Sequence, residues 1–180
     1  MSEPYELYLR AMRRVGHYNW FSLFMKHVGS RVDRALIRVS RGRLSMSGPK
    51  MTTMLLTTKG RKSGKDRTVP LHYVRDGKNL VAACENFGLE ATSSWPKNLL
   101  AHPTARIEIG GTAASYLSRP ATEEEVARNM PRLIEMWPAH DSHMERNGVR
   151  RVIVFEPLKP IHKSTATSSS PRNTEGLSSR

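Results

Sequence analysis

The segment from residue 59 to residue 67, which reads KGRKSGKDR, concentrates the side chains of this chain that could do chemistry. Arginine presents a planar fork of N–H donors and lysine a compact positive charge, and both bind phosphate or carboxylate groups. The glycines permit a tight turn and bring backbone amides close to a ligand. The segment therefore predicts an anion-binding site built from Lys59, Gly60, Arg61, Lys62, Ser63, Gly64, Lys65 and Arg67.

This basic segment has a simpler interpretation, which is a turn that only faces water, as most runs of charge do. The P-loop spacing and the dinucleotide-binding fingerprint are both absent, so no standard nucleotide motif supports a ligand here. The residue pattern alone leaves the two interpretations open.

Apolar, β-branched runs flank the basic segment on both sides and predict a β-hairpin over 51–58 and 67–75. Further strands are predicted at 78–84, 104–109, 112–119 and 150–156, with a tight turn at Asp76 and Gly77. The connections between these strands are mostly too short for crossover helices. We therefore expect an α+β fold, a mostly antiparallel split β-barrel of about six strands with N-terminal helices and with helices inserted between strands.

The N-terminal region has the apolar spacing of amphipathic helices, one over 4–28 and a shorter one over 31–40. In the second helix Val32, Leu36 and Val39 are expected to face inward. The first carries basic residues beside its apolar stripe, which suits an anionic membrane surface or a lipophilic ligand as well as packing on the protein's own barrel.

Two more helices are predicted further along the chain. Ser94 is expected to cap a short helix over 95–101, and Thr122 with Glu125 forms a capping box before an acidic helix that Pro131 should kink. That helix is expected to share one apolar face among Val126, Ala127, Met130, Leu133, Ile134 and Trp137.

The composition of the 180 residues fits one domain with tails: a helical segment over 1–45, a barrel over 46–160 and a disordered Ser/Thr-rich tail over 161–180. The formal net charge is +13, which favours anionic partners. One cysteine excludes an intrachain disulfide, and seven histidines without paired cysteines or an H-E-x-x-H motif predict no metal site. The absence of a signal peptide or a spanning apolar run favours a cytoplasmic protein that could also contact a membrane surface.

The amino-acid sequences of four segments resemble those of one known family. These segments are TTKGRKSGKDRTVPLHYVRDGKNLVAAC, SSWPKNLLAHPTARIEIGG, TEEEVARNMPRLIEMWP and RRVIVFEPLKP, and the similarity runs roughly from Arg31 to Pro160. They are similar to the deazaflavin-dependent nitroreductases and quinone reductases, which use coenzyme F420. The resemblance implies a split β-barrel related to flavin reductases, with a possible homodimer. It also implies hydride transfer from reduced F420 to a quinone, an enone or a nitroaromatic compound.

The resemblance also implies roles for individual residues. The phosphate and acidic tail of the cofactor would contact Lys59, Gly60, Arg61, Lys62, Ser63 and Arg67, and its ring would contact Pro70, Leu71, Asn86, Gly88 and Trp95. Glu85 and Phe87 depart from the family pattern, and Trp95 could instead serve only as a core anchor. Trp20, Trp137, His140 and His143 would surround the acceptor, and His140 would donate a proton to it.

Two other classes of function stay open at this point. A split-barrel protein could bind FMN or heme without this turnover, and a strongly basic chain could bind nucleic acid. The second alternative is the weaker one, because aromatic residues are not interleaved with the basic segment and no helix-turn-helix or zinc pattern is present. No nucleic-acid partner is therefore expected.

Overall fold

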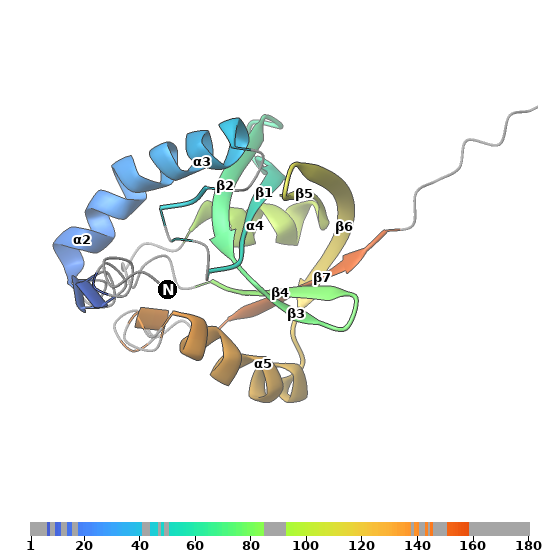
Figure 1. Ribbon diagram of the computed structural model, residues 1–180. Helices are drawn as coiled ribbons and strands as arrows, with labels where there is room; N and C mark the ends of the chain where they lie inside the picture. The colour runs from blue at the N-terminus through green and yellow to red at the C-terminus, as the bar shows by residue number, and fades with distance from the viewer. Residues whose placement is uncertain are drawn as a thin grey trace, which may run out of the picture.

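One antiparallel sheet that curls into a half barrel forms the centre of the molecule (Figure 1). The structure, a computed structural model, describes residues 18–40, 51–84, 93–137 and 151–158, with single residues or short stretches between 7 and 15, 44 and 48, and 139 and 145. Within these residues the sheet has seven strands in the order β2-β1-β5-β6-β7-β4-β3. They are β1 (Thr53–Lys59), β2 (Asp66–His72), β3 (Val74–Asp76), β4 (Asn79–Ala83), β5 (Thr104–Ile109), β6 (Thr112–Pro120) and β7 (Val152–Pro157).

The split-barrel architecture predicted from the sequence is confirmed, but one predicted strand is two. The run 67–75 divides at Tyr73, where the backbone leaves its pairing with β1 and the next residues pair with β4. Because of this division, β2 and β3 lie at opposite ends of the strand order although they are adjacent in sequence.

Strand alternation divides the interior into two apolar clusters. In β4, Leu80 and Ala82 join the cluster enclosed by the curled sheet, whereas Val81 and Ala83 join the cluster beneath a helix. Successive residues of a strand point to opposite faces, so β4 and β7 each contribute residues to both clusters. The enclosed cluster has Met54, Leu56, Ile107 and Phe155 among its most buried members.

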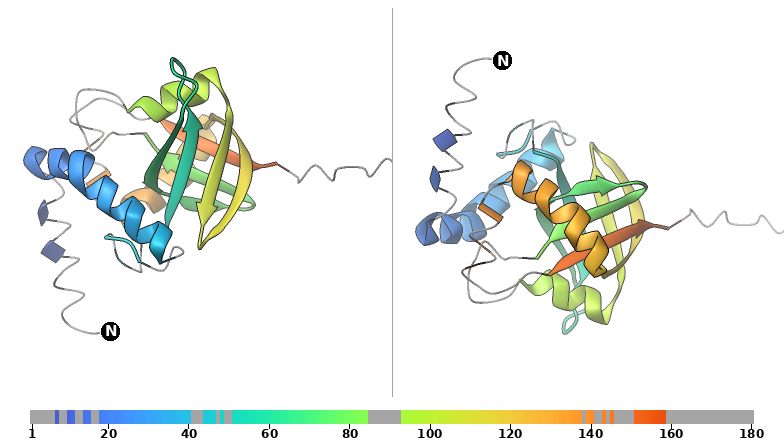
Figure 2. Two further views of the ribbon diagram at one scale, coloured as in Figure 1. Left: turned by 90° about the horizontal axis from the view of Figure 1, so that it is seen from above. Right: turned by 90° about the horizontal axis from the view of Figure 1, so that it is seen from below.

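Helices cover the two sides of the sheet (Figure 2). A continuous stretch of helix runs through α2 (Asn19–Phe24), the π-turn η1 (Met25–Gly29) and α3 (Ser30–Val39), and α3 packs on β2. The helix α4 (Ser94–Ala101) packs on β1, and α5 (Glu123–Met136) packs on β3 and β4. The predicted tail and most of the first seventeen residues lie outside the described residues, and the boundaries at 45 and 160 stay predictions.

Three details of the helix prediction are wrong. Ser94 is the first residue of α4, and its N-cap is Ser93, so Ser94 does not cap the helix. In α5 the expected apolar position Ala127 is exposed, whereas Asn129 is buried because its amide donates to Asp76 at 2.9 Å. The capping box of Thr122 and Glu125 is confirmed.

The third error concerns the orientation of α3. Val32, Leu36 and Val39 face outward, with 44%, 36% and 88% of their surfaces exposed, whereas Asp33 and Ile37 are buried. The inner face of α3 meets polar groups: Arg34 Nη1 donates to the carbonyl of Thr68 in β2 at 2.6 Å. A polar surface beneath the helix selects the polar face of the helix, which reverses the usual amphipathic orientation.

An ion network joins α5 to the sheet. The Arg119 guanidinium donates two hydrogen bonds of 2.7 Å to the Glu125 carboxylate and one of 2.8 Å to Glu156. These bonds from Arg119, with those from Thr122, lower the pKa of the Glu125 carboxyl to about 2. At the other side of the helix, hydrogen bonds from Arg128 and Asn129 lower the pKa of the Asp76 carboxyl.

Candidate functional site

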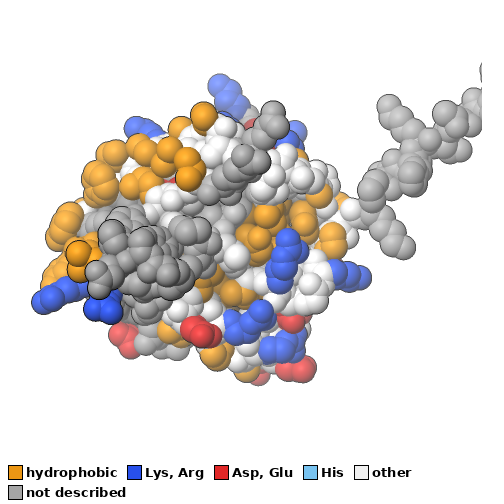
Figure 3. All heavy atoms as spheres, viewed as in Figure 1, with side chains coloured by type: hydrophobic (Ala, Val, Ile, Leu, Met, Phe, Trp, Pro, Cys, Tyr) orange, Lys and Arg blue, Asp and Glu red, His pale blue; other side chains and the backbone are white. Residues whose placement is uncertain are grey.

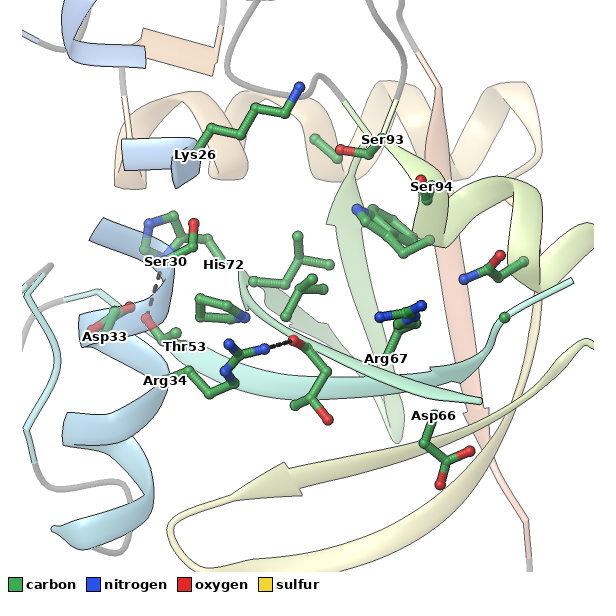
Figure 4. Close-up of a pocket in the computed structure, with 18 of the residues that line it drawn as sticks. Lys26, Ser30, Asp33, Arg34, Thr53, Asp66, Arg67, His72, Ser93 and Ser94 are labelled. Carbon is green, nitrogen blue, oxygen red and sulfur yellow. Dashed lines mark hydrogen bonds between the residues drawn. The ribbon is translucent and has the colours of Figure 1, made fainter. Parts of the chain in front are cut away.

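A cavity of about 700 Å³ lies between the β1–β2 hairpin, α3 and the start of α4 (Figure 4). Its walls come from segments far apart in the sequence, so only the folded chain assembles it. The hairpin end is lined by Gly60, Arg61, Lys62, Ser63, Asp66 and Arg67, and the middle by Val69, Pro70, Leu71, Ala83, Trp95 and Asn98. The α3 end is lined by Lys26, Ser30, Asp33, Arg34, Thr53, His72 and His140.

The hairpin end is a tight, cationic turn. The Gly60 N–H donates to the Lys65 carbonyl at 2.9 Å, and the Gly64 N–H donates to the Gly60 carbonyl at 2.7 Å. Gly64 has a φ of 64°, and a Cβ on Gly60 would lie 2.8 Å from Ser63 Oγ. The positive φ favours glycine at position 64, and a side chain at position 60 would crowd Ser63 and the Lys65 carbonyl. The side chains of Arg61 and Lys62 are exposed at the cavity.

Asn98 of α4 anchors this turn from below. Its side chain is buried, its Oδ1 accepts the Arg61 N–H at 3.1 Å, and its Nδ2 donates to Thr58 Oγ1 at 3.1 Å. A buried amide with both ends hydrogen-bonded holds one geometry. The position of Arg61 is consequently set by a helix that is separated from the turn by more than thirty residues of sequence.

The middle of the cavity is an apolar wall suited to a flat ring. Pro70 and Leu71 of β2 contribute one side, and Trp95 at the start of α4 contributes another. The Trp95 ring lies 6.4 Å from the Phe155 ring, centroid to centroid, with the planes inclined at 32°. Trp95 is therefore both a core anchor and a wall of the cavity, so its interpretation as a core anchor is compatible with a contact to the ring of a ligand.

The α3 end is polar, and Figure 4 shows Ser30, Asp33, Arg34 and His72 gathered there, away from Arg67 and Asp66. His72 Nδ1 lies 3.2 Å from Thr53 Oγ1, and the ring centroids of His72 and His140 are 6.5 Å apart. His140 is almost fully buried, with 5% of its surface exposed.

The structure brings nine of the predicted site residues to this cavity: Gly60, Arg61, Lys62, Ser63, Arg67, Pro70, Leu71, Trp95 and His140. Lys59 ends β1 opposite Asp66 and is not in the lining. Trp137 and His143 are buried and are not among the lining residues, and Trp20 is exposed on α2. Asn86 and Gly88 lie outside the described residues.

The sequence prediction did not include several residues of the cavity, among them Asp33, Arg34, His72 and Asn98. A signal for His72 was available, because it lies two residues after Pro70 on the same strand and so shares its face. Arg34 could not be found in this way, since its place depends on which face of α3 turns inward.

The described part of the chain lacks two further features. It contains no group of three or more His, Cys, Asp or Glu side chains that could hold a metal ion. None of its helices is long and apolar enough to cross a lipid bilayer.

A curled antiparallel sheet with a cationic turn beside an apolar wall is the architecture of the split-barrel folds related to flavin reductases. The family model described as F420H(2)-dependent quinone reductase matches residues 29–157, and the chain belongs to this family. It is thus an F420-dependent oxidoreductase.

Two relatives from Mycobacterium tuberculosis illustrate the similarity in sequence. The F420H(2)-dependent quinone reductase Rv1261c is 30% identical over 99 residues, which cover 53% of this chain and 66% of the relative. Rv3178, which is also named as an F420H(2)-dependent quinone reductase, is 32% identical over 90 residues. The match covers 50% of this chain and 76% of the relative.

Two solved structures share the fold. The F420-H2 dependent reductase FDR-A has a TM-score of 0.54 and 26% identity, and the match covers 58% of this chain and 94% of that one. A structure titled as a domain-swapped dimer has a TM-score of 0.55 and 23% identity, with coverage of 70% and 94%, and supports the fold alone.

Proposed function

We propose that this protein reduces a lipophilic quinone with reduced F420, which binds along the cavity with its anionic tail on the hairpin turn. The observation that carries this proposal is one continuous cavity that joins the cationic turn, through an apolar wall, to a pair of imidazoles. The order of these three surfaces matches an anionic tail, a flat ring and an acceptor that must be protonated.

The residues present fit the cofactor in charge and shape. Arg61, Lys62 and Arg67 outnumber the single Asp66 at the hairpin end, and Asn98 holds the backbone of the turn in place. The volume of about 700 Å³ is in the range of cavities that enclose cofactor-sized ligands. When bound, reduced F420 supplies a hydride, and the protein contributes orientation, electrostatics and exclusion of water.

The acceptor is assigned to the α3 end of the cavity. His140 lines that end and is almost fully buried, which suits a group that gives a proton to an oxygen shielded from water. The quinone is favoured over an enone or a nitroaromatic compound because the names of the two mycobacterial relatives specify quinones.

Binding of F420 by the purified protein tests this assignment. Replacing both Arg61 and Lys62 by alanine should weaken F420 binding roughly 10- to 100-fold and flatten its dependence on salt, because two cations leave the anion site. Fluorescence titration measures both effects. The control variant Lys78→Ala/Arg106→Ala removes the same charge from exposed positions outside the cavity lining. Unchanged affinity at low salt, or tighter binding of FMN than of F420, would refute the assignment.

The outer surface of the N-terminal helices supports a second element of the proposal, contact with an anionic membrane. Figure 3 shows apolar side chains gathered over α2 and α3. We call this set the apolar ridge: Trp20, Leu23, Phe24, Val28, Val32, Leu36 and Val39, each 36% to 88% exposed at spacings of three or four residues.

The charge around the apolar ridge favours lipid as its occupant. Arg31 and Arg38 of α3 are exposed basic side chains, whereas Lys26 and Arg34 line the cavity and the one acidic side chain between residues 18 and 40, Asp33, is buried. Exposed aromatic and aliphatic groups with flanking cations are typical of helices that lie on anionic bilayers. A membrane would also contain the lipophilic quinone that the cavity is proposed to bind. A homodimer of this chain also remains a proposal, and among the described residues the ridge is an exposed apolar surface that could form it.

A further inference from the structure

His72 and His140 reach the same part of the cavity from different elements. His72 is the last residue of β2, and His140 follows α5. Their ring centroids are 6.5 Å apart, and the planes meet edge to face at 78°. A separation of this size can be bridged by one water molecule or by an oxygen of the acceptor.

The ring of His72 is held from two sides. Its Nδ1 lies 3.2 Å from the hydroxyl of Thr53, its cross-strand partner in β1. The ring of Trp137 lies 6.4 Å away on the α5 side, inclined at 42°. Nδ1 faces Thr53, so a proton exchanged with the cavity would move through Nε2.

The charged groups that share this end of the cavity come from the N-terminal helices. Asp33 accepts the Met46 N–H at 2.7 Å, and Arg34 donates to the Thr68 carbonyl, so each has a partner in the fold. Lys26 of η1 also lines the cavity. Asp66 and Arg67 lie at the opposite end (Figure 4).

We propose that His72 is a proton-relay residue that acts through His140, an inference that rests on the proposed function of the cavity. A quinone that has accepted a hydride carries one negative charge on oxygen. An N–H bond of the His140 imidazolium breaks, an O–H bond forms on that oxygen, and neutral His140 is then reprotonated from His72. His72 regains its proton from water, which leaves hydroxide in the solvent, so atoms and charge balance without a further reactant.

The first test needs no cofactor. In the cofactor-free protein, His72→Asn should slow the exchange of the His140 ring N–H proton with water in NMR spectra, because the relay to water loses a member. Asparagine keeps a hydrogen-bonding group near Thr53 and does not titrate in this range. His102→Gln, an exposed histidine after α4, should leave this exchange unchanged. An identical exchange rate of the His140 ring proton in parent and His72→Asn would overturn the inference.

The second test is the pH profile of quinone reduction. His72→Asn should lower kcat roughly tenfold at pH 8 and less at pH 6, where water supplies protons more readily, with the affinity for F420 within twofold of the parent. In a His140→Gln background the same substitution should have no further effect, since relay residues act as a unit. Independent, multiplicative losses would overturn the relay. If the parent does not bind F420, the proposed function itself fails; normal F420 binding with unaltered profiles refutes only the relay.

Discussion

At the scale of single residues, the buried amide of Asn98 has the most direct control over the basic turn. It satisfies the Arg61 N–H and the Thr58 hydroxyl at once, although neither lies near it in sequence. A cationic loop without such an anchor would present its charges in many arrangements, and binding would have to order them. Asn98 is therefore a positioning residue for the anion site.

Replacing Asn98 by alanine tests this role. The change leaves a buried hydroxyl unpaired and frees the turn, so we expect a loss of about 1–3 kcal/mol in unfolding free energy. The affinity for F420 should fall roughly tenfold. Urea unfolding and fluorescence titration measure the two effects. Leu100→Ala, at an exposed position of the same helix, should alter neither. A destabilised Asn98→Ala protein that binds F420 like the parent would contradict the positioning role.

The residues of the basic turn could be predicted because their signal is local. Glycines and cations within nine residues specify a turn and its charge, and the turn sets the pairing of β1 with β2. Asn98 and His72 were not assigned roles, because their functions arise from contacts with residues that only the tertiary fold brings near.

At the scale of elements, α5 depends on the Arg119 network. Its first turn is held by the capping box and by Arg119, which also bonds Glu156 of β7. This network joins β6, β7 and α5, and α5 in turn covers the apolar cluster around Leu133. Acid should consequently weaken the attachment of α5 to the sheet.

The sign of this pH effect follows from the pKa of Glu125. Since the folded pKa, about 2, lies below the ordinary value of 4.5, Glu125 stabilises the fold above pH 4.5, and this stabilisation is lost as the pH falls from 4.5 toward 2. Glu125→Gln should cost about 1–2 kcal/mol at pH 7 and lose less stability across that window than the parent. Urea unfolding at pH 7, 4.5, 3 and 2 measures this. Glu123→Gln, at an exposed position of the same turn, should retain the parent's slope.

The orientation of α3 shows where pattern reasoning ends. Its apolar spacing predicts an amphipathic helix correctly, but the periodicity cannot tell which face meets the protein. Here the surface beneath the helix is polar, and Arg34 bonds the backbone of β2. The apolar residues expected in the core therefore form part of the outer surface.

At the scale of the whole molecule, the apolar ridge predicts binding to lipid. Co-sedimentation with vesicles of phosphatidylglycerol and phosphatidylcholine should capture the parent, and less so at high salt or with phosphatidylcholine alone. The variant Val32→Ser/Leu36→Ser/Val39→Ser should bind at least tenfold more weakly, because each lost apolar side chain contributes about 1 kcal/mol. The control Leu100→Ser/Leu117→Ser changes exposed apolar residues elsewhere.

A different result would identify a different occupant for the ridge. If vesicles do not bind and light scattering shows a dimer that the same triple substitution dissociates, a second copy of the chain covers the ridge. A monomer that does not bind vesicles would contradict both lipid binding and dimerisation through the ridge.

The thickness of α3 has a consequence for how an acceptor travels. One helix, roughly 10 Å across, separates the cavity from the outer apolar ridge. A quinone with a long hydrocarbon chain could place its ring in the cavity while the chain stays dissolved in the bilayer. Encounters would then occur in two dimensions, so turnover would follow the mole fraction of quinone in the lipid. Adding empty vesicles at a constant amount of quinone would slow the reaction, because the quinone would be diluted within a larger area of bilayer.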